Sequence, residues 1–171
     1  LVQQLQATAA GNWQQPPLTG DIGLFGGGNT NAGNINSISY IFISSAGNAV
    51  DFGDLSLNLA NTASCSSSVR GLWAGGTTSY TDAIQFVTIS SLGDSVSFGS
   101  LLSGTAYLVG CSNATRGLFA GGLDPAGAFV TNIIQYVTIA SASNSIDFGD
   151  LSGPRWVLAA CASTTRGLFA G

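Results

Sequence analysis

Three cysteines recur at one interval along the chain. Cys65, Cys111 and Cys161 are 46 and 50 residues apart. Thiolates bind zinc, but zinc sites place cysteines in close pairs, often with histidine, and this sequence has no histidine. Equivalent positions of a repeat point the same way and rarely form a disulfide, although an odd cysteine count in an extracellular protein can indicate pairing between chains. We predict that all three are small buried apolar side chains.

Arginine and aspartate recur in the same register. The residues concerned are Arg70, Arg116 and Arg166, and the pairs Asp51/Asp54 and Asp147/Asp150. Paired carboxylates can act as general acid and base, and a ring of guanidinium groups can bind carboxylates or glycans. The middle repeat has Ser97 and Ser100 in place of the aspartates. This loss favours an architectural role, in which the aspartates cap turns or form ion pairs with the arginines.

The sequence lacks the residues that most enzymes use as general bases. It contains no His, Lys or Glu, so a Ser-His-Asp triad is impossible. Its glycine pairs are not followed by the lysine of a phosphate-binding loop. The Asn-rich segment 29–34 has oxygen ligands that suit calcium, but an ordinary turn is the simpler interpretation. We predict a protein that is not an enzyme and holds no cofactor or metal.

A repeated motif explains the shared interval. Gly-Leu-Phe-Gly-Gly-Gly at 23–28 returns as Gly-Leu-Trp-Ala-Gly-Gly at 71–76 and as Gly-Leu-Phe-Ala-Gly-Gly at 117–122, and the first five residues of this last form recur at 167–171. Periods of this length are typical of solenoids, propellers and arrays. The repeat predicts a series of similar units.

The third repeat predicts four short strands and no helix. Residues 116–122 form an apolar run that ends in a glycine pair, and residues 133–140 are rich in β-branched and aromatic side chains. Residues 145–151 alternate between apolar and polar types, as a half-buried strand does. Residues 156–162 are the most apolar segment, and we expect this strand to be the most buried. The predicted fold class is all-β.

The pattern of this repeat resembles the kelch repeat. The resemblance is carried by Gly121-Gly122, Tyr136, Phe148, Pro154-Arg155 and Ala159-Ala160. The chain has phenylalanine where kelch repeats usually have tryptophan, and only one copy contains Pro-Arg. The phrase IQYVTIASxxNxIDFGDL followed by LAACxSxTRGLFAG resembles more closely the kelch-like repeats of structural proteins of marine phages, especially cyanophages. This resemblance covers roughly residues 21–171.

The resemblance implies β-propeller blades, with the cysteine strand nearest the channel and the Asp-Phe-Gly-Asp strand outermost. Closed propellers usually have four to eight blades. The chain supplies three periods and parts of others, starts at Leu1 and stops within a repeat. We therefore expect that both ends are cut, and that closure needs further sequence or other chains. A β-trefoil or β-prism, which also suits three four-stranded repeats, is the alternative.

The composition is poor in charge. Charged residues make up 7% of the sequence and hydrophobic residues 45%, whereas about 25% charged is typical. We expect that neighbouring subunits or Ser, Thr and Asn cover much of the surface. The net charge of −4 argues against a nucleic-acid partner, and no apolar run reaches the roughly 18 residues of a membrane helix.

The segment after each glycine pair varies among the repeats, at residues 29–37, 77–83 and 123–132. Constant strands with a variable loop are typical of a scaffold that presents binding residues. The candidate binding residues are Asn29, Asn31, Asn34, Thr77, Tyr80, Asp82, Asp124 and Phe129. Residues 1–20 do not match the repeat and are expected to be a connector or a divergent first strand.

The function that follows is that of a non-enzymatic structural protein of a phage virion, in a tail, a fibre or a capsid decoration. Its expected partners are other virion proteins or copies of itself, and its loops can contact host surface glycans. The alternative is a secreted or cell-surface lectin-like binding module of a bacterium.

Overall fold

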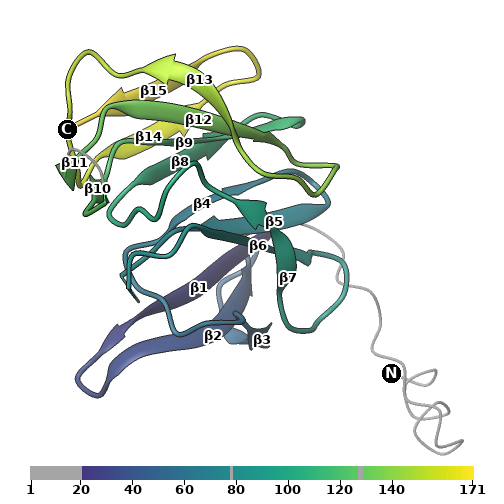
Figure 1. Cartoon of the computed structure of the whole chain (residues 1–171). Helices are drawn as coiled ribbons and strands as arrows, with labels where there is room; N and C mark the ends of the chain where they lie inside the picture. The colour runs from purple at the N-terminus through teal and green to yellow at the C-terminus, as the bar shows by residue number, and fades with distance from the viewer. Residues whose placement is uncertain (1–20, 78, 127–128) are drawn as a thin grey trace, which may run out of the picture.

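The computed structural model describes residues 21–77, 79–126 and 129–171. Within these ranges the regular secondary structure consists of β-strands alone, as the predicted all-β class requires. The strands form small antiparallel sheets that are stacked along the chain (Figure 1). The described residues contain no helix long and apolar enough to cross a membrane. The predicted connector, residues 1–20, lies outside the described residues.

The first sheet has three strands in the order β1-β2-β3. Its strands are β1 (Ile22–Thr30), β2 (Gly33–Phe42) and β3 (Val50–Asp54). We predicted a loop over residues 29–37, but β1 and β2 pair as far as Thr30 and Gly33 and leave only a tight turn. The first variable segment is therefore the end of a long hairpin.

The second and third sheets have four strands each, in the orders β4-β5-β6-β7 and β8-β9-β12-β13. The second contains β4 (Ala63–Ser66), β5 (Arg70–Ala74), β6 (Ala83–Thr88) and β7 (Val96–Ser100). The third contains β8 (Val109–Ser112), β9 (Arg116–Ala120), β12 (Ile133–Thr138) and β13 (Ile146–Asp150). Both confirm the predicted four-stranded repeat. The cysteine strand is at one edge and the strand with Phe-Gly at the other.

Two shorter sheets complete the described chain. The fourth repeat contributes β14 (Ala159–Ala162) and β15 (Gly167–Ala170), which pair with each other. The segment after the third glycine pair, predicted as a loop, contains the small hairpin β10 (Leu123–Asp124) and β11 (Phe129–Val130).

A β-bulge recurs in the outer strand of the first three sheets. In the first sheet Ile38 is paired with Gly53 and Ser39 with Asp51, so that Phe52 is an extra residue between them. The same shift occurs in the other two sheets, beside Phe98 and Phe148. A bulge changes the direction in which a side chain points. In the first two sheets it turns the phenylalanine onto the face that the following sheet covers, where Phe52 and Phe98 are buried.

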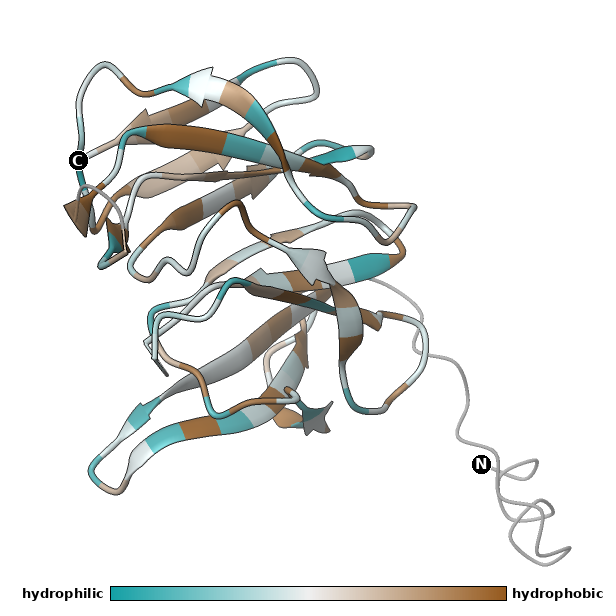
Figure 2. Cartoon of the chain, viewed as in Figure 1, coloured by the Kyte–Doolittle hydropathy of each residue, from teal (hydrophilic) through white to brown (hydrophobic). Residues whose placement is uncertain are grey.

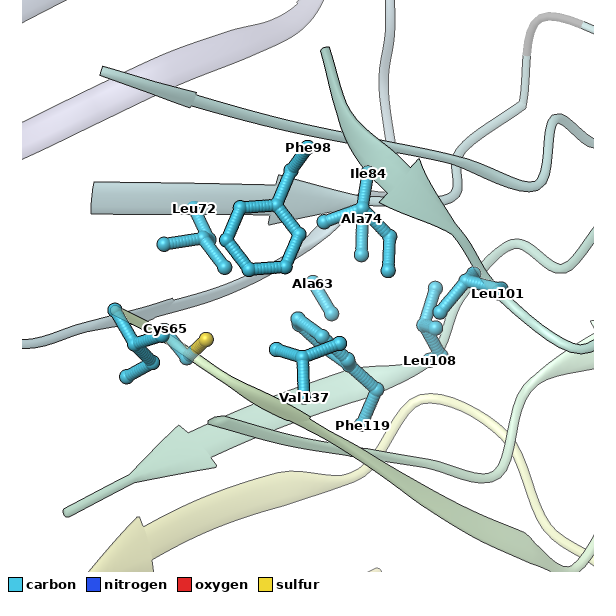
Figure 3. Packing of buried hydrophobic residues seen from close by; sticks show 11 residues of the cluster. Ala63, Cys65, Leu72, Ala74, Ile84, Phe98, Leu101, Leu108, Phe119 and Val137 are labelled. Carbon is cyan, nitrogen blue, oxygen red and sulfur yellow. The ribbon is translucent and has the colours of Figure 1, made fainter. Parts of the chain in front are cut away.

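The core lies between successive sheets. Phe119 and Val137 of the third sheet pack against Phe98 and Ile84 of the second (Figure 3). Trp73 of the second sheet joins Phe52 and other apolar residues of the first. Apolar segments occur in the strands of every sheet (Figure 2). Each sheet is therefore stabilised chiefly by burial against its sequence neighbours, as in other repeat proteins.

The cysteine strand of the last repeat is not the most buried, contrary to our expectation. Trp156 and Val157, which precede β14, are 49% and 65% exposed, and most of β14 is exposed as well. By contrast, β5 of the second sheet is buried over four of its five residues. Position in the stack explains the difference, because β5 has a sheet on either side whereas β14 belongs to the last described sheet.

Candidate functional site

The far end of the β1–β2 hairpin and the paired strands β10 and β11 lie on the same side of the stack (Figure 1). The second variable segment is linked to the first directly, because the Nδ2 of Asn34 donates to the Oγ1 of Thr77 at 3.5 Å. The structure thus brings together predicted binding residues from successive repeats.

The first segment is a compact polar tip. The amide of Asn29 donates to the Oδ1 of Asn34 at 2.7 Å, and the hydroxyl of Thr30 donates to the carbonyl of Gly33 at 3.1 Å. Asn29 and Asn31 are exposed and Asn34 is half-buried. These contacts are those of an ordinary turn, and the described residues contain no group of three or more His, Cys, Asp or Glu placed to hold a metal ion.

Thr77 connects neighbouring repeats. Its hydroxyl donates to the carbonyl of Ala60 at 3.1 Å and accepts from the amide of Asn61 at 3.3 Å. Together with the contact from Asn34, these bonds give Thr77 a structural role at the base of the second segment. A ligand at this position would have to compete with three protein contacts.

The rest of the second segment holds two further predicted residues. Tyr80 is half-buried and has a φ of 50°, a conformation that non-glycine residues rarely adopt. Asp82 has an exposed side chain, and its backbone carbonyl accepts from the N–H of Leu101 at 2.7 Å. The backbone at Asp82 is therefore held by the sheet, while the Asp82 side chain is exposed.

The two predicted residues of the third segment differ in accessibility. Asp124 is 8% exposed, and its Oδ1 accepts from the N–H of Ala126 at 2.9 Å. Phe129 is 59% exposed and has a φ of 71°. Strained, exposed aromatic residues are frequent at functional sites. Phe129 is accordingly the strongest candidate for contact with a ligand, and Asp124 is better placed to shape the turn.

The predicted ion pairs between arginine and aspartate are not formed by Arg70 or Arg116. The guanidinium of Arg70 lies over the ring of Phe86 at 4.4 Å, and that of Arg116 lies over Tyr136 at 4.9 Å. Arg70 also donates to the carbonyl of Ile139 in the third sheet at 2.8 Å. Within the described ranges neither arginine forms an ion pair with Asp. The correction has a physical reason, because the aromatic residue is the diagonal neighbour of the arginine on the adjacent strand, within reach of its long side chain, and cation–π stacking is favourable there.

Two of the three cysteines are buried, as predicted. Cys65 and Cys111 lie in the core, whereas Cys161 is exposed, and all three are free thiols. A Cβ at Gly117 would collide with the sulfur of Cys65, and a Cβ at Gly167 would lie 3.1 Å from the sulfur of Cys111, so these two cysteines fit spaces that glycine leaves in the next repeat. Burial, and less so the neighbouring Cys111, raises the pKa of Cys65 to about 12. Burial also raises the pKa of Cys111. These thiols stay protonated, which suits packing and not nucleophilic chemistry.

Two buried glutamines were not anticipated from the sequence. The Oε1 of Gln85, which is 1% exposed, accepts from the backbone N–H of Ser56 at 2.8 Å and from the hydroxyl of Ser95 at 2.6 Å. The Oε1 of Gln135 accepts from the N–H of Leu102 at 2.8 Å and from the hydroxyl of Ser145 at 2.7 Å. We call this arrangement the glutamine clamp.

The clamp joins the second sheet to the first and the third sheet to the second. Ser56 and Leu102 are the second residues after the outer strands of the first and second sheets, whereas Gln85 and Gln135 belong to the next sheet along the chain. A recurring signal was present in the sequence, because both glutamines come two residues before a valine in otherwise apolar strands. A buried amide in such a strand needs a partner, and here the partner is the neighbouring repeat.

A second contact runs alongside the clamp. Asp94 accepts from the N–H of Asp54 at 3.0 Å, and Asn144 accepts from the N–H of Ser100 at 3.1 Å. In both cases a side-chain oxygen from a turn in one repeat binds the outer strand of the repeat before it. The aspartate and asparagine of these turns therefore have an architectural use that explains their recurrence.

No protein-family model matches the chain, and no curated protein matches it significantly.

Proposed function

We propose that this chain is a non-enzymatic structural protein of a phage virion, built from kelch-like propeller blades. The observation that carries the proposal is the repeated joint between sheets, in which the glutamine clamp and an apolar layer recur from one repeat to the next. Such joints form a rigid scaffold, and the segments that vary between repeats are at its periphery. The virion itself is proposed from the sequence resemblance.

The arrangement of the inner strands supports blades over a trefoil or prism. The hydroxyl of Ser112 on β8 donates to the carbonyl of Ser66 on β4 at 2.7 Å and accepts from its N–H at 3.1 Å. In the next repeat Asn113 donates to the carbonyl of Thr164 at 3.1 Å. Cysteine strands of successive repeats are thus adjacent, as the innermost strands of propeller blades are.

Mass spectrometry of purified phage particles from the source material tests the virion assignment. Trypsin cuts only after arginine here because lysine is absent, which gives long peptides such as 71–116 and 117–155. Chymotrypsin adds shorter peptides. We expect peptides of this chain at a stoichiometry comparable to other virion proteins. Their absence from intact particles would overturn the assignment and favour the lectin-like module.

Binding to host glycans is the second part of the proposal, and Phe129 is its test. The flat face of an exposed aromatic ring is suited to stacking on a sugar. On a glycan array, Phe129→Ala is expected to weaken binding about tenfold. Phe25→Ala is the matched control, because Phe25 is similarly exposed, at 60%, but lies within strand β1 and outside the three variable segments 29–37, 77–83 and 123–132. Equal losses in both variants would contradict a site at the loops.

A further inference from the structure

The strained backbone positions of the chain gather on one side of the stack. Within the described ranges six residues other than glycine have a φ between 50° and 71°. Three belong to the segments after the glycine pairs. The other three precede β4, β8 and β14, which begin opposite the last residues of β5, β9 and β15. All six therefore lie on the side of the variable segments, and they are Ser79, Tyr80, Phe129, Asn61, Tyr107 and Val157.

One strained position recurs at the repeat interval. Asn61, Tyr107 and Val157, which we call the connector positions, have φ values of 56°, 58° and 57°. The N–H of Tyr107 donates to the carbonyl of Asn61 at 2.9 Å, and the N–H of Val157 donates to that of Tyr107 at 3.2 Å. Asparagine tolerates this conformation, whereas it costs free energy at tyrosine and valine. The backbone is thus held in one strained form while the side chain changes, and such strain is frequent at binding sites.

We propose that Tyr107 and Asn61 contact a ligand and extend the site at Phe129, so that the combined site takes a neutral oligosaccharide. This inference rests on the proposed function, because it requires that the loops bind glycans. It adds the class of sugar and two contacts outside the variable segments. Tyr107 lies within the described stack, since the connector positions of the preceding and following repeats flank it on both sides.

A short β-ladder links Tyr107 to Phe129. Ala106 pairs with Leu123 of β10, and the N–H of each donates to the carbonyl of the other, at 3.0 Å and 2.8 Å. On the other side of β10, Asp124 is opposite Phe129 of β11. Strands in a ladder are about 4.8 Å apart, so the two aromatic residues belong to segments about 10 Å apart. A ligand that contacts both must be longer than a single sugar.

The side chains of Tyr107 and Asn61 have hydrogen-bonding groups that the fold does not use. The half-buried ring of Tyr107 packs edge-on against that of Trp156, with centroids 5.5 Å apart, which fixes its orientation. Its hydroxyl has no hydrogen-bond partner in the described part of the chain. The exposed amide of Asn61 donates to Thr77 at 3.3 Å, while its Oδ1 has no partner among the same residues. An oriented ring beside an exposed amide oxygen suits a sugar, which offers a face for stacking and hydroxyls as donors.

The charges on this side of the stack favour a neutral ligand. The recurring arginines, Arg70, Arg116 and Arg166, lie at the ends of β5, β9 and β15 that are opposite the glycine pairs. Arg155 precedes β14, but its guanidinium already donates to neighbouring residues of its own segment at 2.8 Å and 3.2 Å. The side chain of Asp82 is exposed. An acidic sugar would therefore meet a carboxylate and no recurring arginine.

The test is binding of the whole chain to an array of neutral oligosaccharides of one to six units, with their sialylated counterparts. We expect the original chain to bind the longer neutral sugars at least about tenfold more tightly than single sugars or sialylated forms. Tyr107→Asn is expected to weaken binding to the longer sugars about tenfold. Tyr107→Phe keeps the ring and is expected to weaken it by no more than about threefold.

Two features keep a loss of binding distinct from a loss of fold. Tyr107→Asn places at this backbone conformation the residue that Asn61 already carries there, so the thermal midpoint is expected to stay within about 4 °C of the original. Asn61→Gly is a second variant, because glycine adopts a positive φ without strain. It removes the amide and is expected to weaken binding about threefold.

Three outcomes would overturn the proposal, and they separate it from the proposed function. If the original chain binds no glycan on the array, both this inference and the glycan part of the proposed function fail. If Phe129→Ala weakens binding but Tyr107→Asn and Asn61→Gly do not, this inference alone fails. Tighter binding to the sialylated forms would overturn the assignment to neutral sugars.

Discussion

The outer strands of the second and third sheets, β7 and β13, each carry a phenylalanine, but the two side chains have different surroundings. Phe98 packs edge-on against Phe86 with ring centroids 5.7 Å apart, and Phe148 packs edge-on against Tyr136 at 5.9 Å. Phe98 is nevertheless 3% exposed and Phe148 52%. The local geometry is therefore set within the repeat, and burial is set by the neighbouring sheet. Stability should differ between the two faces even where the conformation is the same.

Truncation of the two phenylalanines gives the largest expected contrast. Phe98→Ala is expected to lower the free energy of unfolding by about 4 kcal/mol, because it empties a site in the core. Phe148→Ala removes a half-exposed ring and is expected to cost about 1 kcal/mol. Urea denaturation of both variants measures the difference. Equal losses would contradict the claim that the neighbouring sheet sets the burial.

Loss of a glutamine clamp ranks second. Gln85→Ala leaves the Ser56 N–H and the Ser95 hydroxyl without their buried acceptor and is expected to cost about 3 kcal/mol. Ser39→Ala, at the equivalent position of the first sheet, is expected to change stability by less than about 0.5 kcal/mol. The midpoints of urea unfolding compare the two. A neutral Gln85→Ala would show that the apolar layer alone holds the sheets together.

Substitution of the bulge glycines sharpens the comparison with a smaller effect. Gly53 and Gly149 have similar φ values, 147° and 135°, so alanine is strained at both. Only at Gly53 would the new Cβ also meet the next repeat. We expect Gly53→Ala to be about 2 kcal/mol more destabilising than Gly149→Ala. Thermal unfolding of the two variants tests this. Equal shifts in the melting temperature would show that the contact of Gly53 with the next repeat does not affect stability.

The cysteines give the smallest effect. Because the pKa of Cys65 is raised from 9.0 to about 12, the neutral thiol stabilises the fold below pH 9, and that contribution is lost as the pH rises from 9 towards 12. Between pH 9 and 10 the expected loss from Cys65 is about 1 kcal/mol, and the total loss over this range should be smaller by that amount in Cys65→Ala. A thiol reagent should label exposed Cys161 first and Cys65 last. Rapid labelling of Cys65 in the native protein would contradict its burial.

The strands were predictable because their signals are local. β-branched and aromatic runs, the glycine pairs and the recurrence of the motif predicted the all-β class and the four-stranded unit of the second and third sheets. Position in the stack is not a local property. The sequence of 156–162 is the most apolar, but β14 is exposed because of what lies beside it, which no pattern within the strand records.

The partners of polar residues were harder to predict for the same reason. Arg70 was expected to bind aspartate, but it stacks on Phe86, which lies on the adjacent strand. Gln85 looked like one polar residue in an apolar strand, and its acceptor role depends on Ser56 of the preceding sheet. Register between strands and contacts between sheets determine such pairings, and both require the three-dimensional arrangement.

The most direct test of the account compares three backbone amides in the unmodified chain. Hydrogen exchange at Ser56, Leu102 and Ser152 reports on one repeated position, with the clamp present at the first two. We predict strong protection at Ser56 and Leu102, and exchange at Ser152 that is at least about tenfold faster than at either. Equal protection at all three amides would contradict the account, because burial and hydrogen bonding would then not depend on the next sheet.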